Sequence, residues 1–164
     1  MRVLSVKQPW AGLLMAGEKR FEVRGWRPAD ENGLVLIHAS SNRAPISDLE
    51  NDPLFRKALR TAGMVDKTTW PLSRILGVAE FVRVHRRNEV VPFLSQKDKL
   101  LCGAIKNRAL WRVGRTWAFS NPIPCDGKLN LWQPDAGLRR RIARELSQHR
   151  IPRSLWLEKY TRRP

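Results

Sequence analysis

The sequence predicts a protein of the α+β class, a small β-barrel with helices attached. The chain has 164 residues, 42% of them hydrophobic, which suffices for one domain with its own core. Alternating and continuous apolar segments predict several strands, and amphipathic segments before, between and after them predict helices. Because the helices do not alternate strictly with the strands, the order is typical of an α+β domain.

The first forty residues begin with a strand and a helix and end with a second strand. Residues 3–6 alternate apolar and polar side chains, which predicts the first strand. Residues 8–17 predict the helix, since Pro9 suits a first helical turn and Gly17 suits a helix end. Residues 33–40 are nearly all apolar, which indicates a central strand buried on both faces.

Between these elements lies a charged strand at residues 20–26. Phe21 and Val23 share one face, and we expect them to fill the barrel interior. The opposite face would line an outer groove or rim, and it carries Arg20, Glu22 and Arg24. Lys19 precedes the strand at a corner. Neighbouring arginines disfavour its ammonium form and Glu22 favours it, so distances decide whether this amine can serve as a base.

The middle of the chain predicts a helical insertion at about residues 46–63, followed by further strands. Asp52 suits the N-cap of its helix, Pro53 the first helical position and Gly63 the end. Residues 74–85 are rich in β-branched side chains and predict a strand. Two segments then complete the sheet, residues 115–121, ending before Pro122, and residues 128–133.

The C-terminal part changes to basic helices. Residues 135–149 place Leu138, Ile142 and Leu146 at helical spacing. The rest of this helix surface carries Arg139, Arg140, Arg141 and Arg144. Residues 153–160 predict a further short helix, packed through Leu155, Trp156 and Tyr160.

Charge is the strongest compositional signal. Thirty-one Lys and Arg against 15 Asp and Glu give a net charge of +16. The excess grows along the chain, from +3 in residues 1–60 to +5 in residues 61–110 and +8 in residues 111–164. A polyanion would relieve this self-repulsion, and nucleic acid is the common one. Arginine outnumbers lysine by 22 to 9. A GC-rich genome would explain that ratio, but not the scarcity of acidic residues.

Other function classes find no support in the pattern. His38, His85 and His149 are scattered, so we expect neither a metal site nor a cofactor. Cys102 and Cys125 have no CxxC partner, and reduced thiols are expected. No signal-peptide core and no apolar stretch long enough for a bilayer are present, which predicts a cytoplasmic protein without a membrane partner.

Residues 5–27, SVKQPWAGLLMAGEKRFEVRGWR, resemble the opening of ASCH domains, a branch of the PUA-like superfamily. The likeness rests on the strand–QPW–helix start and on a G-x-K-x-x-E-x-R motif made by Gly17, Lys19, Glu22 and Arg24. Residues 77–81 and 116–132 resemble later parts of the same family. The resemblance implies a closed barrel of five or six strands over residues 1–134, with the first helix capping one opening. Residues 135–164 would then form a basic helical extension packed on the same domain.

The resemblance also implies nucleic-acid binding in a cleft beside the first helix, with RNA or single strands preferred over duplex DNA. Trp26, between Gly25 and Arg27, is the expected stacking platform. Glu22 would accept from a base amino group or hold Arg24 in position. The expected contacts are Lys19, Arg20, Glu22, Arg24, Trp26 and Arg27 in the cleft, with Arg139, Arg140, Arg141 and Arg144 on phosphates.

Two other interpretations stay open. Some ASCH proteins are amidohydrolases acting on N4-acetylcytidine, and ribonuclease activity is attributed to others. In such a hydrolase Lys19 would activate the nucleophile, and Glu22 or a later carboxylate, Glu80 or Glu89, would move the proton. The amidohydrolases carry Thr where this chain has Glu22, which favours binding over catalysis. The third interpretation is an ion-paired strand face that binds no ligand.

Overall fold

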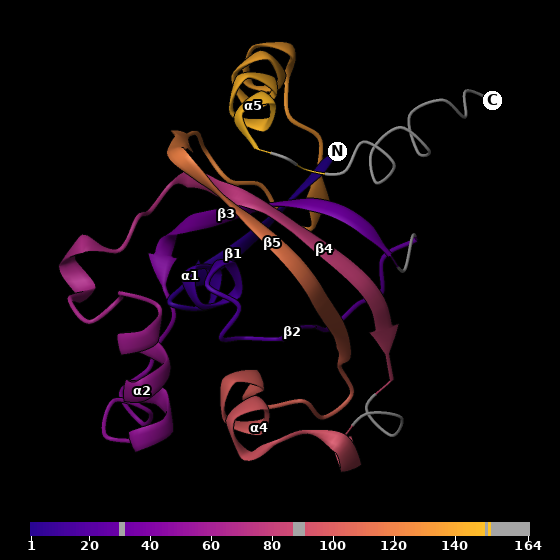
Figure 1. Cartoon of the computed structure of the whole chain (residues 1–164). Helices are drawn as coiled ribbons and strands as arrows, with labels where there is room; N and C mark the ends of the chain where they lie inside the picture. Colours follow the sequence, from indigo (N-terminus) through magenta and orange to yellow (C-terminus); the bar gives the residue numbers. More distant parts are fainter. Residues whose placement is uncertain (30–31, 87–90, 150, 152–164) are drawn as a thin grey trace.

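The computed structural model describes residues 1–29, 32–86, 91–149 and 151. Six strands form one sheet (Figure 1): β1 (Arg2–Gln8), β2 (Phe21–Arg24), β3 (Gly33–Arg43), β4 (Arg74–His85), β5 (Ala109–Pro124) and β6 (Leu131–Trp132). The α-helices are α1 (Trp10–Met15), α2 (Pro53–Thr61), α4 (Gln96–Cys102) and α5 (Ala136–Gln148). Two short 3-10 helices are η1 (Lys67–Thr69) and η2 (Val91–Phe93).

The strand order is β2-β5-β4-β3-β1-β6. β1 runs parallel to β3, and all the other neighbouring pairs among the described strands are antiparallel. The predicted α+β class and the barrel-like sheet are confirmed. The sheet curls into a half-barrel, and its ladder runs from β2 at one edge to β6 at the other without closing between them.

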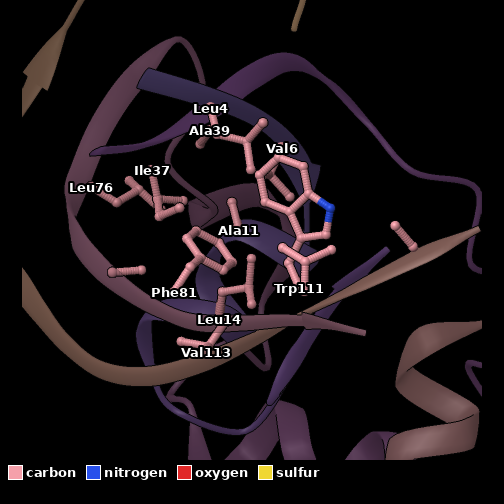
Figure 2. Close-up of a cluster of buried hydrophobic side chains, with 13 residues drawn as sticks. Leu4, Val6, Ala11, Leu14, Ile37, Ala39, Leu76, Phe81, Trp111 and Val113 are labelled. Atoms are coloured by element: carbon pink, nitrogen blue, oxygen red, sulfur yellow. The ribbon is translucent and has the colours of Figure 1, made fainter. Parts of the chain in front are cut away.

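The concave face of the half-barrel holds the main core (Figure 2). α1 places Ala11 and Leu14 into it, and both are fully buried. Trp111 lies among these side chains with its ring edge-on to Phe81, at 5.5 Å between ring centroids. The other members come from β1, β3, β4 and β5, namely Leu4, Val6, Ile37, Ala39, Leu76, Ala79, Val84, Ala109 and Val113. This packing explains the expected capping position of the first helix.

The convex face carries a second core beneath α5. Leu138, Ile142 and Leu146 pack there, as their spacing predicts, against residues such as Val78 and Phe119 of the sheet. Asp135 caps the helix by accepting from Leu138 N. Residues 153–160 lie outside the described residues. The division into a domain at 1–134 and an extension at 135–164 therefore stays a prediction.

The predicted helical insertion is present as α2. Asp52 is its N-cap, with Oδ1 accepting from the backbone N–H groups of Leu54 and Phe55. Phe55, Ala58 and Leu59 are buried in a third core, which also contains Leu13 of α1 and Trp70. Leu54, in the first turn of α2, is exposed.

α4 and β5 differ most from the predictions. α4 was not predicted, although Ser95 and Asp98 form a capping box at its start. β5 begins at Ala109 rather than at residue 115, and it does not end before Pro122 but continues to Pro124. β2 pairs only with residues 109–112 of β5, so beyond them β5 has β4 on one side alone. A proline is tolerated there because its missing N–H faces no partner strand.

Candidate nucleic-acid interface

β2 turns its charged residues toward the inside of the half-barrel, the reverse of the prediction. Glu22 pairs in register with Trp111, a residue of the concave core. Phe21 and Val23 instead pack on the convex side with Leu94. Alternation along a strand shows which side chains share a face, but not which face is covered, and a one-residue change of register exchanges them. The predicted outer groove at Glu22 and Arg24 is therefore wrong.

Lys19 lies beneath the surface at the corner before β2, with only 3% of the residue exposed. Its Nζ donates to Phe21 O at 2.5 Å and to Leu101 O at 2.9 Å. The same atom lies 4.0 Å from Glu22 Oε2 and 5.8 Å from the ring centroid of Trp10. Lys19 thus ties the start of β2 to the end of α4, and its ammonium is surrounded by acceptors from the protein itself.

Glu22 and Arg24 extend the contacts of Lys19 across the open side of the half-barrel. Arg24 Nε lies 2.9 Å from Glu22 Oε1. Arg24 Nη2 donates to Ser5 O of β1 at 2.7 Å, so a side chain of the edge strand β2 reaches the far end of the sheet. We call Lys19, Glu22 and Arg24 the ionic chain. It closes by side chains the gap that the backbone ladder leaves between β2 and β1.

Arg20 makes a separate contact with α4. Its Nε donates to Asp98 Oδ1 at 3.0 Å, and its Nη2 contacts Oδ2. Burial opposes ionisation of the Asp98 carboxyl, but hydrogen bonds from Arg20 and Ser95 outweigh burial and lower its pKa. The Asp98 hydrogen bond likewise raises the pKa of Arg20. Sequence reasoning missed Asp98, and the Ser-x-x-Asp spacing of a capping box was the signal that could have found it.

A pocket of about 420 Å³ lies at the C-terminal end of β2. Its lining combines two predicted site residues, Trp26 and Arg27, with residues not predicted: Gly25, Arg86, Asn107, Arg108 and Ala109. The Trp26 ring stands edge-on to the ring of Trp111, with 4.8 Å between the ring centroids and 85° between the ring planes. This contact with a buried side chain fixes the orientation of the Trp26 ring. Arg27 Nη2 donates to Val84 O at 3.4 Å. This pocket follows β2, whereas α1 precedes β2 in the chain, so the pocket is not the cleft beside α1 that the resemblance implies. That cleft stays a prediction.

The structure does not bring together the two predicted basic regions. The four α5 arginines are all exposed, while α5 itself packs on the convex core. We call Arg139, Arg140, Arg141 and Arg144 the α5 arginine face. In Figure 1, α5 and the end of β2 lie on different sides of the sheet. Contact of this face with phosphate stays a prediction.

Glu80 does not complete a catalytic pair with Lys19. Glu80 faces the convex side, where its Oε2 accepts from Arg115 Nε at 3.1 Å, whereas Lys19 lies at the concave side. Glu89 lies outside the described residues. Within the part of the chain that is described, no three His, Cys, Asp or Glu side chains gather as metal ligands.

His38 and the cysteines occupy packed positions. His38 is fully buried and its Nε2 lies 3.0 Å from Cys125 O. Burial lowers the pKa of its imidazole, and the Cys125 contact opposes that effect. Both cysteines are free, and burial raises the pKa of each thiol. Among the helices described, none has the length and hydrophobicity to cross a membrane.

Comparison with known proteins identifies the family. The ASCH domain family matches residues 4–124, well over half of the chain. Crystal structures of ASCH from Zymomonas mobilis and of a point mutant of it are 14% identical and cover 87% of this chain. The TM-scores are 0.48 over 93% of the first and 0.49 over 96% of the mutant. No curated protein sequence matches the chain significantly. The extent of the family match shows that this chain belongs to the ASCH domain family.

Proposed function

We propose that this ASCH domain binds single-stranded nucleic acid, RNA before DNA, in the pocket at the end of β2. The composition of the pocket carries the proposal. Its lining holds one tryptophan, one asparagine and three arginines, and none of its described lining residues is acidic. Guanidinium groups bind phosphate bidentately, indole rings stack on bases, and an amide can donate to or accept from a base edge.

The size of the pocket favours an unpaired nucleotide over a duplex. About 420 Å³ is within the range of small-ligand sites, so one splayed base with its sugar fits its scale. In a duplex the base faces are stacked and closed to an aromatic side chain. Single-stranded loops and ends expose these faces, which is why sequence-specific RNA recognition uses them.

Trp26 is prepared for stacking before a ligand arrives. Its ring rests edge-on against Trp111, which is itself almost fully buried. A platform held in this way loses little conformational entropy on binding. Stacking of one base on an aromatic side chain contributes roughly 1–3 kcal/mol.

The ionic chain supports the pocket from a distance. Arg24 is fixed between Glu22 and Ser5 O and precedes Trp26 by two residues. We propose that the chain positions the end of β2, and with it Trp26 and Arg27. The hydrolase alternative finds no supporting observation, because Lys19 and Glu22 are buried and directed at each other and at protein groups.

Fluorescence anisotropy with a dye-labelled 12-nucleotide RNA tests the proposal. We expect binding at 50 mM salt that weakens steeply by 200 mM. Trp26→Ala should weaken it about 5- to 150-fold, the equivalent of 1–3 kcal/mol, and Trp26→Phe should recover most of the affinity because the ring is retained. The same measurement with single-stranded DNA and with duplex DNA compares their affinities with that of the RNA, which should bind most tightly. Absence of RNA binding at low salt, or equal affinity of Trp26→Ala and wild type, would refute the pocket.

A further inference from the structure

The convex face of β4 and β5 contains an uncovered strip between two helices. Toward one end of this face, α5 covers Val78 and Phe119. Toward the other end, Phe21 and Leu110 are buried against Leu94, with Cys102 of α4 and Ile105 packed on them. Between them the strands carry exposed side chains, including Val82, Arg83 and Arg112. Figure 1 shows β4 and β5 crossing between α5 and α4, and none of the labelled helices lies over them there.

A β-bulge turns Arg83 onto this strip. Ala79 and Phe81 point into the concave core, and strict alternation would send Arg83 there as well. The register between β4 and β5 shifts between Phe81 and Arg83, so Val84 takes the next inward position. β-Bulges occur next to functional sites, where they redirect a side chain. Here the bulge brings a guanidinium to the surface.

The redirected Arg83 lies directly opposite Arg112 of β5. Like charges at opposite positions of a ladder repel each other and destabilise the sheet. Neither arginine has an ion pair with a carboxylate among the described residues. Glu80, which lies on the same convex face of β4, is paired with Arg115. Two cations at one cross-strand position, without a carboxylate partner among the described residues, favour an external anion.

The arginine pair lies on the same two strands as the basic lining of the pocket, with the buried Leu110 of β5 between them. Arg86 follows β4 by one residue and Arg108 precedes β5 by one residue, and both line the pocket. Arg112 lies four positions after Arg108, about 13 Å along an extended strand. A nucleic-acid strand with stacked bases advances about 3.4 Å per nucleotide, so roughly four nucleotides cover that distance.

We propose that the Arg83–Arg112 pair is a phosphate-binding site for the part of the strand that leaves the pocket. This rests on the proposed function and extends it from one nucleotide to a second contact on the convex face of β4 and β5, on the other side of the covered Leu110. The contact is to phosphates, so it adds affinity and salt dependence without sequence preference.

The test compares Arg83→Gln/Arg112→Gln with Arg56→Gln/Arg60→Gln, which removes the same charge from the exposed surface of α2. Binding of the 12-nucleotide RNA is measured by anisotropy from 50 to 200 mM salt. The slope of log K against log salt should become shallower by about 1.4 in the first variant, for two lost phosphate contacts at about 0.7 each. The α2 control should keep the wild-type slope, and Arg83→Lys/Arg112→Lys should restore it because the charges return.

Binding of a trinucleotide, followed by quenching of tryptophan fluorescence, separates the two proposals. It should be unchanged in the Arg83→Gln/Arg112→Gln variant, since a trinucleotide with one base in the pocket is too short to reach the pair. If RNA binds but the slope of this variant equals that of the α2 control, the inference is wrong and the pocket proposal stands. If wild type binds no RNA, both fail. Binding of this strip to phosphatidylserine vesicles instead of RNA would also overturn the inference.

Discussion

Lys19→Met tests whether the motif lysine holds the fold or contacts a ligand. The buried Nζ makes hydrogen bonds of 2.5 and 2.9 Å to two carbonyls and faces the Glu22 carboxylate at 4.0 Å. Methionine keeps the length of the apolar stem but leaves those three acceptors without this donor. Loss of one partner of a buried ion pair costs roughly 3–5 kcal/mol. Because Glu22 keeps Arg24, we expect the lower end, about 3 kcal/mol.

Urea and thermal unfolding followed by circular dichroism measure this effect. For a domain of this size, a loss of about 3 kcal/mol corresponds to a decrease in Tm of roughly 6–12 °C. The control is Lys57→Met, an exposed lysine on α2, for which a change within about 0.5 kcal/mol is expected. RNA affinity of the folded Lys19→Met fraction should stay close to wild type, because Glu22 and Ser5 O still hold Arg24, the member of the ionic chain nearest to Trp26 in sequence.

The opposite pattern would contradict the argument. If Lys19→Met unfolds like wild type but loses RNA binding, the lysine contacts the ligand, as the sequence pattern suggested. A variant that hydrolyses nothing while wild type releases product from RNA or N4-acetylcytidine would favour the catalytic interpretation. Chromatography of the incubated substrates provides that readout.

Three other experiments address separate parts of the molecule. Gly77 has φ +156°, and a Cβ added there would lie 2.2 Å from Trp117 O. Gly77→Ala should therefore lower the unfolding free energy by about 1–3 kcal/mol in thermal denaturation. The control is Gly25→Ala, where the Cβ enters open space and the change should stay within about 0.5 kcal/mol. Burial lowers the pKa of His38 below 6.5, so its contribution to stability is complete above pH 6.5 and is lost as the pH falls, by at most about 1.4 kcal/mol per pH unit. Urea unfolding between pH 7.5 and 5 should show a shallower dependence in His38→Gln, and an identical slope would refute this. Burial likewise lowers the pKa of the N-terminal amine, to about 6, so the difference between variant and wild type isolates the histidine. Replacing all four residues of the α5 arginine face with Gln should weaken binding to all RNA sequences alike and reduce the slope of log K against log salt by about 2.8. A loss of affinity confined to one RNA sequence would contradict phosphate contact.

Local signals allowed much of the fold to be predicted. The boundaries of β4 and the Asp52 cap of α2 follow from side-chain chemistry within a few residues. The apolar stripe of α5 follows from helical periodicity. The family also follows from a short stretch, since the QPW and G-x-K-x-x-E-x-R elements lie close together in the chain. Each of these features depends on neighbours in sequence, which is why the sequence alone determined it.

Tertiary structure decided which face of each strand is buried and what gathers at a site. Glu22 points inward because β2 pairs with β5 in the register that puts it beside Trp111. Trp26 and Arg27 meet Arg86 and Arg108 only because β2, β4 and β5 are neighbours in the sheet, although these residues lie far apart in the chain. Arg83 reaches the surface through a bulge, one extra residue that strict alternation does not contain. Register and convergence are properties of long-range pairing, and no local pattern encodes them.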